Sequence, residues 1–280
     1  MSDKLDLPKL TAIALTTARA AGQWVERGHR SHPSYERKQS DADLVTRFDV
    51  ESEQLIRRML AEQTPDIPVV GEEQGGAWDE RPTWVVDPID GTMNFAHGHA
   101  YYCVSIGLMH AGAPLLGAVV APALECEWYG HVGGGAFRNG QACRVSGQTI
   151  LSDALVGTGF SPVMRRLGHP EDNVAAFCRV YPYVRDLRRC GAAALDMCMV
   201  ADGSYEAYWE RRLSAWDMAA GAALVLAAGG HLTNLTGGPY NLHHGYILAS
   251  NGLVHDNLIE LLKLDGNPTW IPNPHNQAKG

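Results

Sequence analysis

The stretch Trp84 to Phe95, WVVDPIDGTMNF, concentrates residues whose types and spacing suit metal and phosphate chemistry. Asp87 and Asp90 stand three positions apart after an apolar run. In an extended strand that separation puts two side chains on opposite faces, so their convergence requires a turn, which Pro88 supplies. Convergent carboxylates stay ionised only when a cation lies between them. Because oxygen ligands without His or Cys select a hard divalent ion, the stretch predicts a Mg²⁺ site.

A phosphate-binding position is predicted directly after these acids. Gly91 and Thr92 follow at the expected start of a helix, where open N–H groups favour an anion and glycine lets it approach closely. Metal ligands, a phosphate position and a hydroxyl together indicate metal-assisted phosphoryl transfer to water. The alternative interpretation is that DPIDG is simply a turn. Two further stretches favour chemistry: VVGEEQG ends an apolar run with Glu72 and Glu73, and WDMAAG places Asp217 at the front of an apolar helix.

Periodicity and turn residues predict the elements that position these acids. The first half should begin with a helix over residues 7–30. A polar surface loop or loose hairpin follows, and then a second helix that Asp49 caps and Pro65 stops. Short buried strands at IPVV and TWVV should deliver their carboxylates to their C-terminal ends. Residues 101–146 alternate apolar and polar positions, which predicts an antiparallel meander with a hairpin at Asn139-Gly140.

The second half is expected to alternate strands and helices. Strands are predicted near Leu155, at YVRDLR and at YEAYWE, and helices over 173–181 and 192–200. WDMAAGAALVLAAGG reads as a buried helix closed by its glycine pair. Near residue 150 the predicted pattern changes from an antiparallel meander to alternating strands and helices. This change divides the chain into an α+β half, 1–150, and an α/β half, 151–280.

Composition narrows the range of partners and compartments. The chain has 280 residues, 45% of them hydrophobic, and a formal charge of −8, which argues against a nucleic-acid or anionic-membrane partner. Its six cysteines form no CxxC pair, so reduced thiols are expected. The charged N-terminus lacks a signal-peptide core, and no apolar run approaches the ~20 residues of a membrane span. The predicted location is the cytoplasm.

The chain resembles the inositol monophosphatase family of lithium-sensitive, Mg²⁺-dependent phosphatases. The resemblance rests on GEE at Gly71 to Glu73, on the whole of WVVDPIDGTMNF and on WDMAAG at Trp216 to Gly221. The weaker motifs DLVTRFD, GGGAFRNGQ, GAAALDMCMVADG and YWE follow in the family's order, from about Leu7 to Leu264. The resemblance implies a layered αβαβα sandwich of the sugar-phosphatase type, assembled as a homodimer. The two halves then form one catalytic unit, with metal motifs in the first and substrate elements and the last metal ligand in the second.

The resemblance also implies a set of metal ligands. The first Mg²⁺ would be held by Glu72, Asp87 and the carbonyl of Ile89, and the second by Asp87, Asp90 and Asp217. A weaker third ion would be held with help from Glu72, Glu73 or both.

The expected catalytic residues are Glu72, Thr92 and Asp49. Thr92, oriented by Asp49, would activate the attacking water, and the backbone of Gly91 and Thr92 would hold the phosphate. Lys38 matches a family lysine near the metal site. The alternative for Asp49 is a helix cap, and for Lys38 a solvated charge; Thr46 and Asp43 are expected to cap and shape the loop.

The resemblance leaves the phosphorylated alcohol open. Substrate contacts are implied for Gly191, Ala193 and Glu210, and the Glu210 carboxylate suits the vicinal hydroxyls of inositol. Arg212 departs from the family pattern, and its guanidinium at the pocket mouth would welcome a second anionic group. The leading interpretation is hydrolysis of myo-inositol monophosphate, a small phosphate monoester. The alternatives are histidinol phosphate or fructose 1,6-bisphosphate as substrate and, in another class, a partner protein in transcription antitermination.

Overall fold

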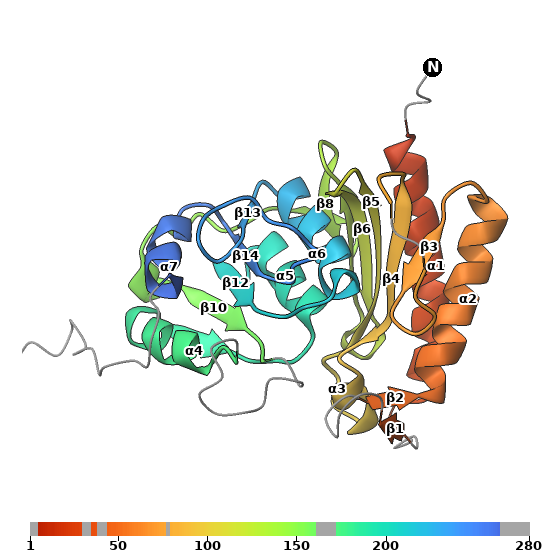
Figure 1. Ribbon diagram of the computed structural model, residues 1–280, viewed down its shortest axis with the longest axis horizontal. Helices are drawn as coiled ribbons and strands as arrows, with labels where there is room; N and C mark the ends of the chain where they lie inside the picture. Colours follow the sequence, from red (N-terminus) through yellow and green to blue (C-terminus); the bar gives the residue numbers. More distant parts are fainter. Residues whose placement is uncertain (1–4, 30–34, 38–43, 77–78, 161–171, 264–280) are drawn as a thin grey trace, which may run out of the picture.

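The computed structural model of the chain describes residues 5–29, 35–37, 44–76, 79–160 and 172–263. Within these ranges, two large β-sheets alternate with three layers of helices (Figure 1). Helices α1 and α2 cover the outer face of a seven-stranded sheet, α5 and α6 lie between the two sheets, and α4 and α7 cover the outer face of a five-stranded sheet. The expected αβαβα sandwich is therefore confirmed.

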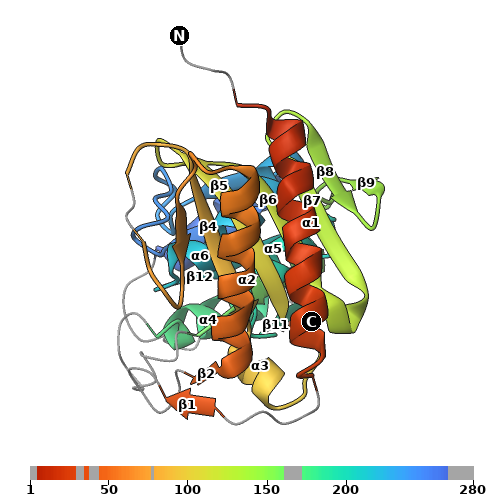
Figure 2. The ribbon, with the colours of Figure 1, turned by 90° about the vertical axis from the view of Figure 1, so that its right-hand side faces the viewer.

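The outer helices of the first layer are α1 (Leu7–Glu26) and α2 (Arg47–Gln63), which lie side by side on the sheet (Figure 2). The expectation that Asp49 caps the second helix is wrong. The helix begins earlier, because Thr46 is the N-cap residue and its hydroxyl accepts a hydrogen bond from the Phe48 N–H at 3.1 Å. Asp49 is the third helical residue and accepts a bond from the Thr46 N–H at 2.8 Å, which completes a capping box. The expected capping role of Thr46 is confirmed.

The seven-stranded sheet has the order β3-β4-β5-β6-β7-β8-β9. Its first pair is parallel and the rest is the predicted antiparallel meander, with the Asn139-Gly140 hairpin between β8 and β9. A separate antiparallel pair, β1 and β2, precedes α2, as the expected hairpin requires. The bounds are β1 Tyr35–Arg37, β2 Leu44–Thr46, β3 Val69–Gly71, β4 Thr83–Asp90, β5 Cys103–His110, β6 Ala113–Ala121, β7 Cys126–His131, β8 Gly135–Arg138 and β9 Gln141–Cys143.

The five-stranded sheet has the order β11-β10-β12-β14-β13. The predicted strands β10 to β12 pair in parallel, whereas β13, β14 and the helix α7 were missed, because the turn-rich segment before β14 hides their periodicity. The bounds are β10 Leu155–Thr158, β11 Asp186–Arg188, β12 Ala207–Glu210, β13 His231–Thr233 and β14 Ile247–Ser250. The remaining helices are α3 Thr92–Ala96, α4 Val174–Val180, α5 Ala193–Ala201, α6 Ala215–Ala227 and α7 His255–Leu262, with single 3₁₀ turns at Pro122–Leu124, Leu151–Asp153 and Tyr181–Tyr183.

A pair of glycines lets α6 rest directly on the seven-stranded sheet. Gly107 on β5 pairs with Gly117 on β6. A Cβ atom at Gly107 would lie 2.8 Å from the Ala220 N atom, and one at Gly117 would lie 2.3 Å from the Ala220 carbonyl oxygen. Side chains at these positions would push the helix outward. The close approach matters because Asp217 lies one turn before Ala220 on the same helix.

The described helices include none long and apolar enough to cross a membrane. All six cysteines are free, as the sequence predicts.

A buried histidine network ties the end of the five-stranded sheet to α7. The His255 ring lies 2.9 Å from the Thr233 Oγ atom through Nε2 and 2.7 Å from the Ser250 Oγ atom through Nδ1. Its side chain is 2% exposed. Burial, with a contribution from neighbouring His231, lowers the pKa of His255 to about 4. The folded protein therefore holds a neutral imidazole that the unfolded chain would protonate.

This network predicts acid-dependent stability. An unfolded histidine titrates near pH ~6.5, so the stabilisation is complete above that pH and is lost as pH falls toward 4. Between pH 7 and pH 5 we expect the free energy of unfolding to fall by about 2 kcal/mol more in the wild type than in His255→Gln. Urea unfolding at both pH values measures it, with exposed His110→Gln as the control. Equal losses in the wild type and His255→Gln would contradict the assignment.

Candidate active site

A β-bulge on β4 turns Asp87 and Asp90 to the same side. Asp87 pairs with Ser105 and Asp90 with Cys103, so three steps along β4 match two steps along β5. The extra residue restores the two-residue period that puts side chains on one face. Pro88 lies in this bulge, where a missing backbone donor costs no ladder bond. The predicted turn is thus a bulge inside a strand that continues to Asp90.

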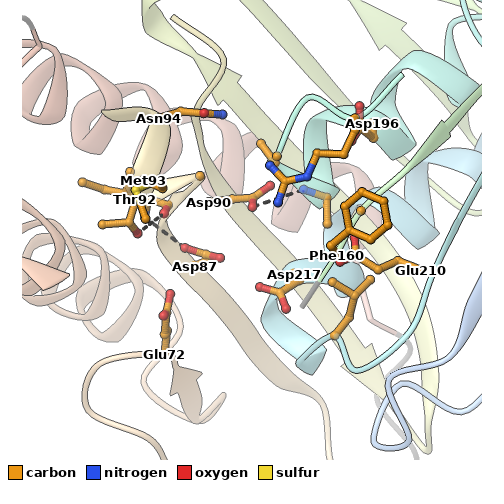
Figure 3. A pocket seen from close by; sticks show the side chains of 18 residues that line it. Glu72, Asp87, Asp90, Thr92, Met93, Asn94, Phe160, Asp196, Glu210 and Asp217 are labelled. Carbon is orange, nitrogen blue, oxygen red and sulfur yellow. Dashed lines mark hydrogen bonds between the residues drawn. The ribbon is translucent and has the colours of Figure 1, made fainter. Parts of the chain in front are cut away.

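The third carboxylate comes from the start of α6. Carboxylate oxygens of Asp87, Asp90 and Asp217 all lie within 4.8 Å of one another, and Figure 3 shows the three side chains converging. Asp217 is the third residue of α6, and its carboxylate accepts a hydrogen bond from the Ser214 N–H at 2.6 Å. Ser214, not Asp217, is therefore the N-cap residue. Asp217 combines a capping-box position with a place in the carboxylate cluster.

The cluster is electrostatically unfavourable without a counter-charge. Burial raises the pKa values of all three carboxyl groups, that of Asp90 to about 7 and those of Asp87 and Asp217 well above their ordinary range. Their mutual repulsion and the charge of Glu72 add to this effect for Asp87 and Asp217. The N–H groups of Ala193 and Ala194 at the start of α5 donate to Asp90 at 3.2 and 2.7 Å. These two bonds lower the pKa of Asp90 and so oppose the effect of burial. Oxygen-only donors with raised pKa values fit a hard divalent cation, which would restore the ionised state.

The remaining predicted metal ligands lie around this cluster. Glu72 follows β3 directly and lines the same cavity as the three aspartates, to the side of Asp87 (Figure 3). The carbonyl of Ile89 lies in the bulge, 3.0 Å from the Thr92 Oγ atom. Glu73 is not among the described residues that line the cavity.

A buried carboxylate outside the cluster, absent from the sequence prediction, holds the turn that carries Glu72. Glu53 on α2 accepts hydrogen bonds from the N–H groups of Glu73 at 2.7 Å and Gln74 at 3.1 Å. Arg57, one turn later, bonds to Glu53 at 2.7 Å and to the Val69 carbonyl at 3.0 Å. These bonds fix the turn after β3 against α2.

The structure brings Asp49 and Thr92 together as the family resemblance implies. The Thr92 Oγ atom lies 3.1 Å from Asp49 Oδ1, although the two residues are far apart in the sequence. Asp49 is fully buried, and its other oxygen accepts bonds from the Thr46 N–H and hydroxyl. Burial raises the pKa of Asp49 to about 6 despite these bonds. Lys38 and Asp43 lie outside the described residues.

The cavity beside the cluster has a volume of about 230 Å³. Gly91 enters its wall with φ +90°, a conformation that favours glycine, and Thr92 begins α3 there. The Asn94 side chain crosses to the opposite wall, where it donates to the Cys190 carbonyl at 2.9 Å. Gly191 follows with φ +89°. The backbone N–H of Ala193 is already used by Asp90, so that residue lines the cavity without an open donor.

Glu210 closes the far side of the cavity from the end of β12. Tyr208 donates a short hydrogen bond to its Oε2 atom. Gly159 makes room for the carboxylate, because a Cβ atom at Gly159 would lie 1.9 Å from Glu210 Oε2. Burial raises the pKa of Glu210 to about 7, although the Tyr208 bond and the charge of Arg189 lower it.

Several cavity residues were missed by the sequence analysis. Arg189 supplies the guanidinium that was expected from Arg212. Arg189 lines the cavity, whereas Arg212 is not among the described residues that do so. Its Cζ atom lies 5.8 Å from the centroid of the Phe160 ring, which also lines the cavity. Asp196 is buried there and accepts a bond from the Tyr101 hydroxyl at 2.8 Å. The signal for Arg189 was its position two residues before Gly191; Asp196 looked like an ordinary residue of an apolar helix.

A layered sandwich with carboxylates gathered at one end of a small polar cavity is the arrangement expected of a metal-dependent phosphatase. Residues 6–264 match the sequence profile of the inositol monophosphatase family. The chain belongs to this family, and it is a phosphatase.

Named relatives and solved structures agree with this assignment. Nus factor SuhB of Pseudomonas aeruginosa is 38% identical over 244 residues, covering 85% of this chain and 90% of that protein. Inositol-1-monophosphatase of Synechocystis is 34% identical over 268 residues, covering 95% and 92%. The structure of inositol monophosphatase from Anabaena (Nostoc) gives a TM-score of 0.82 at 34% identity, covering 91% of this chain and 96% of that one. That of extragenic suppressor protein suhB from Bartonella henselae gives 0.84 at 31%, covering 91% and 98%.

The dual position of Asp217 leads to a test of its role. Asparagine keeps an oxygen for the Ser214 N–H but removes a charge from the cluster. We expect Asp217→Asn to melt at or above the wild-type temperature without metal, because repulsion falls, and to lose roughly 10²-fold or more of its phosphatase rate. Melting curves and phosphate release on one preparation measure both. Asp256→Asn, in the exposed first turn of α7, is the matched control, and a fully active Asp217→Asn would reduce Asp217 to a capping residue.

Proposed function

We propose that the protein is a Mg²⁺-dependent phosphatase that hydrolyses myo-inositol monophosphate to inositol and phosphate. The observation that carries this proposal is the buried Glu210 carboxylate, which lines the same cavity as the three-aspartate cluster. A carboxylate accepts hydrogen bonds from vicinal hydroxyls, so it suits the ring of a polyol. The names of relatives at 34% identity and above support the same alcohol.

The residues of the cavity suggest a division of labour. Mg²⁺ held by Glu72, Asp87, Asp90, Asp217 and the Ile89 carbonyl would neutralise the phosphoryl oxygens and the leaving oxygen. Thr92, donating to Asp49 at 3.1 Å, presents an oxygen lone pair to the attacking water; as it takes the proton of the water, it passes its own hydroxyl proton to the Asp49 carboxylate. The open backbone at Gly91 and Thr92 receives the phosphate oxygens. Glu210 and the wall at Gly191 orient the alcohol.

A sugar bisphosphate is the second candidate substrate, and Arg189 is the observation that favours it. A guanidinium in the cavity wall binds a second phosphate group by paired hydrogen bonds. Fructose 1,6-bisphosphate belongs to this class. Histidinol phosphate, with an amine that Glu210 would attract, completes the comparison.

A role in transcription is a candidate of another class, because the Pseudomonas aeruginosa relative is named as a Nus factor. Such a role is compatible with an intact catalytic cavity. The formal charge of −8 favours a protein partner over direct contact with RNA. A pull-down from cell extract that recovers RNA polymerase would support this role, and its absence from the eluate would count against it.

Homodimer formation and a cytoplasmic location also belong to this proposal. The homodimer rests on the resemblance to the inositol monophosphatase family, which matches residues 6–264. Light scattering of the purified protein measures the oligomeric state.

We expect strict dependence on Mg²⁺ and inhibition by millimolar-range Li⁺. A small monovalent ion fits a carboxylate site built for Mg²⁺ without supplying its charge. Phosphate release is measured in EDTA, after Mg²⁺ is restored, and with added LiCl against KCl as the control. Full turnover in EDTA would reject the metal-dependent mechanism.

We expect Glu210→Gln to change the preference among phosphate esters more than the Mg²⁺ requirement. The charge that receives the alcohol hydroxyls is lost, whereas the aspartate cluster is intact. A phosphate-release panel of inositol monophosphates, fructose 1,6-bisphosphate, histidinol phosphate and nucleotide 3′-phosphates measures the preference. The matched control is Glu206→Gln, because the Glu206 carboxylate is also buried but accepts a hydrogen bond from the Leu155 N–H at 2.6 Å and does not line the active-site cavity as described. An equal loss for every ester would show that Glu210 does not select the alcohol.

A further inference from the structure

A second cavity, of about 360 Å³, lies on the other side of the loop that follows Glu210. Its wall combines the loop after β12, the turns before β14 and the end of α7, at the end of the molecule farthest from α1 and α2 (Figure 1). Three cationic or titratable nitrogen groups line it, from Arg211, His244 and Lys263. No described acidic side chain lines it, in contrast to the active-site cavity.

The Nε atom of Arg211 is buried and has no hydrogen-bond partner among the described residues. A buried guanidinium N–H without a hydrogen-bond partner is energetically unfavourable. A ligand that accepts hydrogen bonds would therefore stabilise this side chain. Lys263 carries a partly exposed ion pair with Glu260 at 3.2 Å, which competes weakly with a bound anion. The local charge in the cavity is therefore positive.

The cavity walls are formed in advance of any ligand. The Asn234 side chain accepts bonds from the N–H groups of Thr236 and Gly238, both at 2.9 Å, which fixes one turn. Asn241 fixes the next by accepting from the His243 N–H at 2.9 Å. Leu235, Tyr246 and Leu262 supply an apolar surface beside the cations.

We propose that this cavity is a second binding site, which takes the phosphate group of inorganic phosphate or of a small phosphorylated molecule. A phosphate dianion matches two fixed cations better than a carboxylate does, and its oxygens can meet guanidinium, ammonium and imidazole donors together. The apolar surface would receive the body of an organic phosphate. This site is separate from the catalytic one and does not depend on the proposed substrate.

The two cavities share one wall. Leu213 lines the active-site cavity, and its N–H donates to the Gly245 carbonyl at 3.1 Å, between two residues that line the second cavity. Gly245 is pressed against Leu213, since a Cβ atom there would lie 2.2 Å from the Leu213 carbonyl oxygen. Arg211 itself follows Glu210 directly. An anion bound to Arg211 would therefore contact the start of the loop that connects Glu210 to Asp217.

Calorimetric titration of the full-length, metal-free protein with inorganic phosphate tests the proposal. Without metal, the aspartate cluster repels phosphate, so binding reports the second cavity. We expect one phosphate per chain, tighter binding of phenyl phosphate, and little binding of acetate at the same concentration. Arg211→Gln should weaken phosphate binding at least about tenfold, since a charged hydrogen-bond donor is lost.

Two further variants make the result decisive. Lys263→Gln changes an exposed residue and should weaken binding several-fold, even if Arg211→Gln fails to fold by circular dichroism. Arg189→Gln removes the guanidinium of the active-site cavity and should leave phosphate binding unchanged. The proposal is overturned by absent binding, by equal affinity for acetate, by unchanged affinity in Lys263→Gln, or by loss of binding in Arg189→Gln.

Discussion

Mutual repulsion among three clustered aspartates is the constraint on which the rest of this structure depends. Carboxylate oxygens of the buried Asp87 and Asp90 and of the half-buried Asp217 lie within 4.8 Å of one another, an arrangement that opposes folding unless a cation compensates. The surrounding protein supplies partial relief through backbone N–H groups, which donate to Asp90 from the start of α5, to Asp87 from Ile89 and to Asp217 from Ser214. A bound cation would relieve the remaining repulsion, and this gain in electrostatic energy would favour metal binding at the site.

Two backbone devices make this crowding possible. The bulge on β4 turns two aspartates to one side, and the glycine pair under α6 lets the third arrive without an intervening layer of side chains. Gly107 and Gly117 are not among the described residues that line the active-site cavity. These two glycines nevertheless determine how near Asp217 lies to β4. The packing of α6 on the sheet and the geometry of the carboxylate cluster therefore depend on the same two residues.

The sequence predicted the parts of this site that are encoded locally. Motif spacing identified the three aspartates that the structure brings together, and periodicity found most elements of the first half. It misjudged the start of α2, because Thr46 and Asp49 are both acceptable caps and only the three-dimensional bonds distinguish them. It also assigned a guanidinium to Arg212 where the structure uses Arg189, since strand and loop geometry decide which side chain faces the cavity. Glu53, buried and distant in sequence, gave no local signal.

The separation of the ligands along the chain has a consequence for biosynthesis. Asp87 and Asp217 lie 217 − 87 = 130 positions apart, the first on β4 of the seven-stranded sheet and the second on α6. A nascent chain that has emerged only as far as β9 carries two of the clustered aspartates without the third, and so experiences little of their repulsion. The electrostatic cost arises late, when α6 docks onto its glycines and closes a very long loop. Assembly of the carboxylate cluster is thereby coupled to completion of the chain, and an unfinished or misdocked product lacks the complete cluster.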